Sequence, residues 1–194
     1  MQKLIFATNN QYKKQEIRSV LKGNFDIITL QEAGINIDIP EPYDTLEENA
    51  RTKAVTIYQL TQTGCFGEDT GLEVEVLNGA PGVKSARYAG EGRDFNANVN
   101  KLLWELKDKT NRKARFRTVI SLILQGTEYQ FEGICEGEIT DEPRGKDGFG
   151  YDPVFVPQHD NRTFAEMTLE EKNTYSHRAK AMDQLIHFLL TIKP

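Results

Sequence analysis

The segment Gly67-Glu68-Asp69-Thr70-Gly71-Leu72 places two adjacent carboxylates between glycines, where two apolar stretches of the chain meet. Cys65-Phe66 comes before it and residues 72–77 follow it, and both stretches have strand-like composition. Burying a carboxylate costs several kcal/mol unless the group is paired or bound to a metal. Gly, Asp and Thr are also common in turns, so this segment alone favours a turn over a functional site. Three other segments change that balance.

Length and composition set the limits of the interpretation. The chain has 194 residues, 38% of them hydrophobic and 27% charged, which fits one large domain or two small lobes. No apolar run approaches the ~20 residues of a membrane span, and Met1-Gln2-Lys3-Leu4 shows no signal-peptide core. Cys65 and Cys135 lie in strand-like stretches, as reduced buried thiols do. We expect a cytoplasmic protein without a membrane segment.

The charge balance narrows the class of ligand. The net charge is −5, and the chain has no basic tail or stripe of Lys and Arg. Nucleic-acid binding draws most of its affinity from phosphate neutralisation, so we expect no nucleic-acid partner. A small polyphosphate remains possible, because a few local cations and a divalent metal suffice to bind it.

Hydrophobic periodicity predicts alternating strands and helices. Ala50, Ala54, Ile57 and Leu60 form the apolar face of the longest early helix. The early βα alternation and a later hairpin predict a mixed α/β sheet with helices on its faces. A separate middle lobe, with the site in a groove between lobes, is the arrangement we expect. The predicted strands cover residues 4–7, 25–30, 72–77, 115–124, 129–136 and 154–156, and the predicted helices cover residues 13–21, 46–60, 95–106 and 176–190.

The second informative segment is Thr8-Asn9-Asn10-Gln11-Tyr12-Lys13, a turn from strand to helix. Main-chain N–H groups at a helix start can bind phosphate. Lys13 and Lys14 are unfavourable for the helix dipole at this position, which favours a role in binding an anion. The alternative is that both are solvated surface charges. Without the glycines of a Walker loop the motif alone is weak.

The remaining two segments carry aromatic and cationic groups. In Gly145–Pro153 the glycines allow close backbone approach, Phe149 and Tyr151 could stack on a planar base, and Asp152 could accept its N–H groups. A surface loop whose aromatics fold onto the core is the alternative. Ser176-His177-Arg178 opens the last helix after Lys172, with Ser176 suited to N-capping. A lone histidine such as His177 is more often structural than functional.

Together these segments resemble the inosine triphosphate pyrophosphatase family, whose members hydrolyse non-canonical purine nucleoside triphosphates. The resemblance runs from residue 3 to about residue 190 and includes the Phe149–Pro153 and Ser176–Arg178 motifs in order. Asn9 and Thr70 depart from the residues that many members carry, Gly and Ser. The other motifs that carry it are Thr8–Lys13, Glu48-Asn49-Ala50 with Lys53, residues 68–72, Gly79-Ala80-Pro81-Gly82 and Ser85-Ala86-Arg87-Tyr88.

The resemblance implies hydrolysis of ITP, dITP or XTP between the α and β phosphates, which removes these nucleotides from the pool. It implies that Asp69 is the proton acceptor and a Mg²⁺ ligand, with Glu41 as second ligand. It implies one elongated, two-lobed α/β domain over residues 1–194 with a central cleft, and a homodimer. Substrate contacts would come from Thr8, Asn9, Asn10, Gln11, Tyr12, Lys13, Lys53, Thr70, Phe149, Gly150, Tyr151, Asp152, Lys172, His177 and Arg178.

A hypothesis about selectivity follows. Donors from His177 and Arg178 aimed at position 6 of the purine would bond a keto oxygen and face the amino group of adenine without a partner. Two alternatives stay open: a Maf-like nucleotide pyrophosphatase of related fold, and a nucleotide-binding module without catalysis. The first differs in its substrates, and the second would have no need of a water-activating carboxylate at Asp69.

Overall fold

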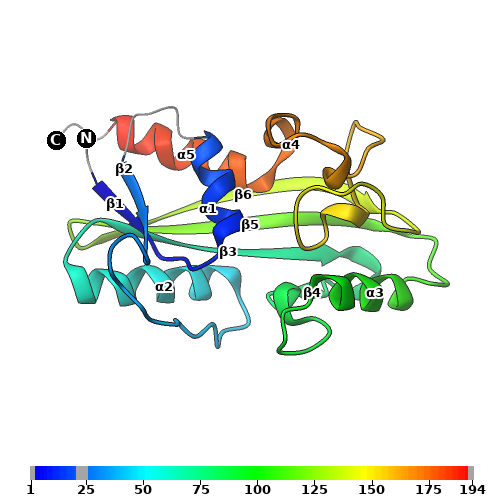
Figure 1. Ribbon diagram of the computed structural model, residues 1–194, viewed down its shortest axis with the longest axis horizontal. Coiled ribbons are helices and arrows are strands. Elements are labelled where there is room, and N and C mark those ends of the chain that lie inside the picture. The colour runs from blue at the N-terminus through cyan, green and yellow to red at the C-terminus, as the bar shows by residue number, and fades with distance from the viewer. Residues whose placement is uncertain (1–2, 21–25, 192–194) are drawn as a thin grey trace. The chain divides into compact units, whose positions relative to one another are not determined.

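The structure is a computed structural model, and it describes residues 3–20 and 26–191 (Figure 1). Within them, every predicted helix and strand overlaps an observed one, and the structure adds the strand Pro81–Gly82 and the helix Leu169–Tyr175. The strands are β1 (Lys3–Phe6), β2 (Asp26–Thr29), β3 (Cys65–Val74), β4 (Pro81–Gly82), β5 (Lys113–Leu124), β6 (Thr127–Ile139) and β7 (Phe155–Pro157). The α-helices are α1 (Gln11–Val20), α2 (Leu46–Thr61), α3 (Phe95–Glu105), α4 (Leu169–Tyr175) and α5 (His177–Thr191).

The strands form a mixed sheet in the order β2-β1-β3-β5-β6-β7, with β4 paired to β3. β1 runs parallel to β2 and β3, and Ile5 lies opposite both Ile28 and Cys65. The pairs β3–β4 and β6–β7 are antiparallel. The expected mixed α/β fold with flanking helices is therefore confirmed.

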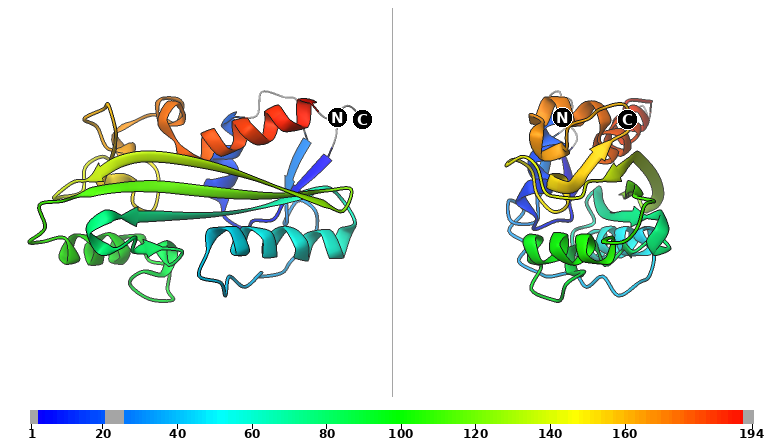
Figure 2. Two further views of the ribbon diagram at one scale, coloured as in Figure 1. Left: turned by 180° about the vertical axis from the view of Figure 1, so that it is seen from behind. Right: turned by 90° about the vertical axis from the view of Figure 1, so that its right-hand side faces the viewer.

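The chain divides into two compact units that share the long strands β3, β5 and β6. Unit 1 comprises residues 1–69, 118–133 and 178–194, and unit 2 comprises residues 70–117 and 134–177. In unit 1, α1 and α5 cover one face of the sheet and α2 covers the other (Figure 2). The core of unit 2 packs α3 against strand residues such as Leu72 and Phe155.

The segment that opened the sequence analysis lies inside one continuous strand, so the turn interpretation is wrong. β3 runs unbroken from Cys65 to Val74, and Glu68 and Asp69 are only 2% and 7% exposed. The strand predicted for residues 72–77 ends at Val74, and Glu75–Leu77 form a 3-10 helix. Glycine inside a strand often marks the close approach of another main chain, and Gly67 lies against the carbonyl of Ala50.

Most helix predictions are confirmed, with one clear exception. Ala50, Ala54 and Ile57 are fully buried on α2, but Leu60 is 61% exposed because it lies in the last turn of the helix. Thr168 and Glu171 form a capping box at the start of α4. The last helix begins at His177, one residue later than predicted. The predictions for Leu21 and Phe25 lie outside the described residues.

The two cysteines and the membrane prediction can be checked directly. Cys65 and Cys135 are both buried thiols outside any disulfide, as expected. The Cys65 thiol donates to the carbonyl oxygen of Ala54 at 3.2 Å, and burial raises its pKa to about 12. In the described part of the chain no helix is long and apolar enough to span a membrane.

Candidate active site

The turn from β1 to α1 is held by its own side chains. The Asn10 side-chain oxygen accepts from the main-chain N–H groups of Tyr12 and Lys13, at 3.0 and 3.2 Å. Thr8 Oγ1 accepts from Asn10 N–H at 3.1 Å, and Asn9 donates to the carbonyl of Ile37. Asn10 therefore caps α1, so the turn is preorganised by hydrogen bonds among residues predicted to contact phosphate.

Lys53 joins two acidic side chains in unit 1. Its ammonium donates to Asp69 Oδ1 and to the Glu68 carbonyl, each at 3.0 Å, and it pairs with Glu41 Oε1. The close approach of α2 and β3 makes these contacts possible. A Cβ atom on Gly67 would lie only 2.3 Å from the carbonyl oxygen of Ala50, so β3 can pass α2 at this distance only with glycine there.

A second group of charges surrounds Glu68. The guanidinium of Arg178 donates to Glu68 Oε1 at 2.9 and 3.2 Å and to Glu16 Oε2. Lys13 Nζ lies 3.5 Å from the same Glu68 oxygen. Glu16, Glu68 and Arg178 are each at most 5% exposed. Buried charges persist only when paired, and here each cation has a carboxylate partner.

The electrostatics of the cluster favour a proton acceptor at Asp69. Burial raises the pKa of Asp69 above its usual range, and Lys53 and Lys13 reverse only part of this rise. Burial lowers the pKa of Lys13, offset in part by Glu68. Burial also acts to lower the pKa of Lys53, but Asp69 and Glu41 outweigh it and the pKa is raised. Asp69 is thus a stronger base than an exposed aspartate.

The donor chemistry of the cluster fits a magnesium ion. Glu41 and Asp69 each place a carboxylate oxygen against the Lys53 ammonium, so the two carboxylates lie close together. Mg²⁺ commonly takes one or two protein carboxylates and completes its octahedron with water and phosphate oxygens. Among the described residues, no three His, Cys, Asp or Glu side chains could hold a metal by themselves. A metal at Glu41 and Asp69 would therefore need further oxygens from water or a substrate.

The loop before β7 is organised around Asp152 in unit 2. Asp152 Oδ2 accepts from Phe149 N–H at 2.8 Å and from Lys172 Nζ at 2.6 Å. Lys172 also lies 5.2 Å from the centre of the Phe149 ring. Asp152 and Lys172 are 3% and 4% exposed, whereas Phe149 and Gly150 are half-buried. The buried ion pair thus fixes the main chain that carries Phe149.

The other predicted purine contacts, Tyr151, His177 and Arg178, lie in different surroundings. The Tyr151 ring is only 4% exposed and its hydroxyl donates to the Ser85 carbonyl at 2.9 Å, so the expectation that this ring stacks on a base is wrong. His177 is 3% exposed and stacks on Phe116 at 4.6 Å. Arg178 belongs to the charged cluster of unit 1, while His177 belongs to unit 2.

The predicted site residues thus fall into two groups. Lys13, Glu41, Lys53 and Asp69 lie in one charged cluster, and residues 149–152 with Lys172 lie in one loop environment. Thr70 follows Asp69 in β3 and is half-buried. Sequence reasoning missed Glu16, although its position one turn after Lys13 on the same helix was a usable signal. It also gave no role to Ser85.

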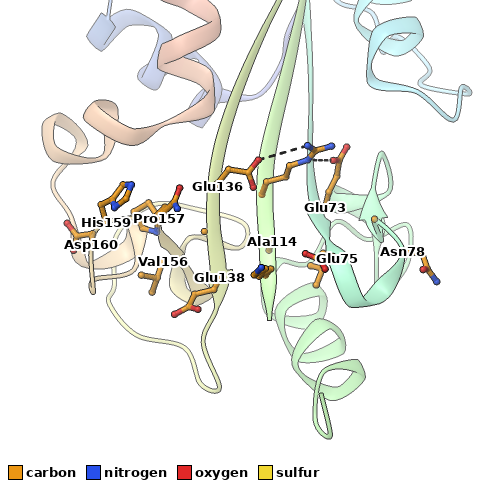
Figure 3. A pocket seen from close by; sticks show the side chains of 16 residues that line it. Glu73, Glu75, Asn78, Ala114, Glu136, Glu138, Val156, Pro157, His159 and Asp160 are labelled. Atoms are coloured by element: carbon orange, nitrogen blue, oxygen red, sulfur yellow. Dashed lines mark hydrogen bonds and ion pairs between the residues drawn. The ribbon is translucent and has the colours of Figure 1, made fainter. Parts of the chain in front are cut away.

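A pocket in unit 2 contains none of the predicted site residues. It has a volume of about 780 Å³ and is lined by strands β3, β5, β6 and β7 (Figure 3). Arg115 crosses it, donating to Glu73 at 2.7 Å and lying 4.0 Å from Glu136. Its carboxylates, from Glu73, Glu75, Glu136, Glu138 and Asp160, outnumber its lysine and arginine side chains, so it is poorly suited to a polyphosphate.

The comparisons with known proteins agree on one protein family. A family model described as the Ham1 family matches residues 4–188. A Porphyromonas gingivalis protein named dITP/XTP pyrophosphatase is 54% identical over 194 residues and 100% of both chains. A protein of the same name from Flavobacterium johnsoniae is 50% identical over 98% of this chain and 100% of its own length. The solved Ham1 proteins of Coxiella burnetii and Staphylococcus aureus are 37% identical, cover 99% of this chain and 100% of theirs, and give TM-scores of 0.90 and 0.89.

Proposed function

The chain belongs to the Ham1 family, and we propose that it hydrolyses the non-canonical purine nucleotides dITP, ITP and XTP to the monophosphate and pyrophosphate. The relatives at about half identity over the full length carry the name dITP/XTP pyrophosphatase. The observation that carries the proposal is the buried cluster in which Lys53 joins Glu41 and Asp69. A binding module without catalysis would have no use for a buried carboxylate of raised pKa.

We assign Mg²⁺ as the cofactor, held by Glu41 and Asp69 together with substrate oxygens. Both residues offer the hard oxygen donors that the ion prefers. When bound, the ion would acidify water and offset phosphate charge. Lys53 contacts both carboxylates and so holds Glu41 and Asp69 close to each other.

The residues of the cluster then divide the chemistry between them. Asp69 accepts the proton of the attacking water, which cleaves the bond between the α and β phosphates. Pyrophosphate leaves and the hydroxyl remains on the monophosphate. Lys13 and Lys53 stabilise the negative charge that develops on the phosphates. Residues 8–12 and Thr70 complete the proposed phosphate contacts, with Asn10 holding the turn in place.

The loop of unit 2 supplies the proposed purine and sugar contacts. Phe149 is the half-buried aromatic of this loop, and Asp152 and Lys172 support it from the core. Gly150 and the main chain of Tyr151 complete the loop surface. On the family resemblance alone we assign recognition of the purine keto oxygen at position 6 to His177 and Arg178, although the Arg178 guanidinium pairs with Glu68 and Glu16 in the structure. Such donors disfavour adenine, because its amino group is also a donor. The family resemblance and the composition further support a cytoplasmic homodimer, without nucleic-acid or membrane partners.

The experiment that tests this function measures products from a panel of nucleotides. The purified chain with Mg²⁺ is given dITP, ITP, XTP, dGTP and dATP, and pyrophosphate and inorganic phosphate are quantified separately. We expect one pyrophosphate per monophosphate from dITP, ITP and XTP. We expect kcat/KM for dATP to be lower by at least about 30-fold, as two buried unpaired donors would cause. Release of inorganic phosphate, or equal use of dATP, would contradict the proposal.

A further inference from the structure

Ser85 connects two parts of unit 2 through its side chain. Its hydroxyl accepts from the main-chain N–H of Leu72 in β3 at 2.8 Å. It donates to the carbonyl of Gly82 at 2.6 Å. Ser85 is 9% exposed, and a buried hydroxyl with both a donor and an acceptor partner is fully satisfied. Its side chain therefore holds the segment that starts at Ser85 against the strand that carries Thr70.

The same segment is anchored by α3 on its other side. The buried Asn98 donates to the carbonyl of Ala86 at 3.1 Å and accepts from Ala89 N–H at 2.7 Å. Lys101 donates to the carbonyl of Tyr88 at 2.8 Å. These bonds fix the main chain of residues 85–89, here called the 85–89 segment. Because both strand and helix hold it, the segment can act as a rigid support.

The loop that carries Phe149 is bonded to the 85–89 segment through the Tyr151 hydroxyl. The Tyr151 hydroxyl donates to the Ser85 carbonyl at 2.9 Å, a contact between residues 66 positions apart in the sequence. The ring of Tyr151 lies in the hydrophobic core of unit 2. Tyr151 stands next to Gly150 and Asp152, and Asp152 in turn accepts the main-chain N–H of Phe149.

The loop is rich in glycine, so the bonds that hold it matter for the place of Phe149. Gly145, Gly148 and Gly150 all have positive φ, at 85°, 76° and 63°. Glycine loses more conformational entropy on ordering than other residues, so several bonds are needed to order this loop. The main-chain N–H groups of Lys146 and Asp147 donate to the carbonyl of Ala165, and side-chain bonds add to these. Asp152 and Lys172 fix one side of it, and the bond from Tyr151 to Ser85 fixes the other.

We propose that Ser85 and Tyr151 are positioning residues that set the place of Phe149 for the purine. Neither side chain contacts substrate: Ser85 acts through its carbonyl on Tyr151, and Tyr151 acts on Phe149 through the loop main chain. This inference rests on the proposed function, because it assumes that a purine binds at Phe149. It predicts that loosening the support weakens substrate binding more than it slows the chemical step.

The test uses Tyr151→Phe and Ser85→Ala, assayed for pyrophosphate release from dITP. We expect each change to raise KM about 3- to 10-fold, the effect of losing one net hydrogen bond, while kcat stays within twofold. In the double variant we expect the rise in KM to be smaller than the product of the single rises, because both changes release the same support. Loss of folded protein lowers kcat but leaves KM unchanged. A rise in KM at constant kcat therefore distinguishes a positioning role from a loss of stability.

The matched control is Tyr175→Phe. Tyr175 also donates its hydroxyl within unit 2, to Asp160 at 3.1 Å, but it has no bond to the 85–89 segment. Its KM should stay within twofold of the unaltered chain. If Tyr151→Phe has the KM of this control, or lowers kcat alone, the inference is overturned. If Ser85→Ala does not fold, Tyr151→Phe alone tests the inference, because phenylalanine keeps the ring that packs in the core of unit 2. If the unaltered chain releases no pyrophosphate from dITP or XTP, the proposed function fails instead.

Discussion

A Cβ atom added at Gly67 would lie 2.3 Å from the carbonyl oxygen of Ala50 and 2.7 Å from the Cβ of Lys53. Both neighbours belong to α2, so the clash is between main chains and cannot be relieved by rotating a side chain. The same helix places the Lys53 ammonium 3.0 Å from Asp69. The spacing of α2 and β3 therefore controls the geometry of the charged cluster.

For Gly67→Ala we expect a loss of about 1–3 kcal/mol in the free energy of unfolding, or more, because the core is overpacked. We also expect reduced kcat, since α2 and Lys53 must move away from Asp69. Urea denaturation and the pyrophosphate assay measure the two effects. Gly92→Ala is the control: no atom lies within 4 Å of its added Cβ, and stability and kcat should not change. Equal behaviour of the two variants would refute the packing argument.

Individual site residues could be predicted from sequence only where a motif marked them. Asp69, Lys53 and Lys13 were identified from the resemblance, and the structure brings them into one cluster. The partnership of Arg178 with Glu16 could not be foreseen, because it joins residues 162 positions apart. Tyr151 was expected at the ligand because its motif is aromatic, but the burial that fixes its role is a property of the folded chain.

At the scale of elements, the turn that follows β2 is joined to α1 by charge. Glu32 accepts from the N–H and hydroxyl of Thr29, at 2.8 and 3.0 Å, and pairs with Lys14 and Arg18 of α1. The main-chain bond from Thr29 and the bond from Lys14 lower the pKa of Glu32 to about 2. The ionised carboxylate is therefore favoured in the folded state.

The lowered pKa of Glu32 makes the free energy of unfolding depend on pH. A depressed carboxyl pKa contributes stability above its unfolded value of 4.5, and that contribution is lost as pH falls from about 4.5 to about 2. Glu32→Gln should therefore destabilise the protein at pH 6 and have little effect near pH 2. Because Glu32 is 34% exposed and solvent screens it, we expect only about 1 kcal/mol at pH 6. Urea midpoints at both pH values test this, and a difference independent of pH would contradict it.

Most helices and strands could be predicted from the sequence, because their apolar faces are buried in the structure. Val99 and Leu102 of α3 are buried, and so are Met182, Leu185 and Leu189 of α5, at the spacing of an apolar helix face. β3 was the exception: its glycines and acids suggest a turn, yet pairing with β1 and β4 and packing on α2 override that local preference. Local pattern cannot reveal such tertiary support.

Across the whole molecule, the charged cluster is collected from five distant parts of the chain. Lys13 and Glu16 come from α1, Glu41 from the segment before α2, Lys53 from α2, Glu68 and Asp69 from β3, and Arg178 from α5. The proposed function rests on this assembly together with membership of the Ham1 family. No single segment determines it, which is why each motif was weak alone.

The central claim is that Asp69, within this cluster, accepts the proton during cleavage of the triphosphate. Asp69→Asn keeps the size of the side chain and removes the base, whereas Asp38→Asn, at an exposed position of the same unit, serves as control. The measurement is kcat for pyrophosphate release from dITP with saturating Mg²⁺, with folding checked by thermal unfolding. We predict that kcat falls by about 10²- to 10⁴-fold for Asp69→Asn and is unchanged for Asp38→Asn. A folded Asp69→Asn variant that keeps the kcat of the unaltered chain would contradict the account.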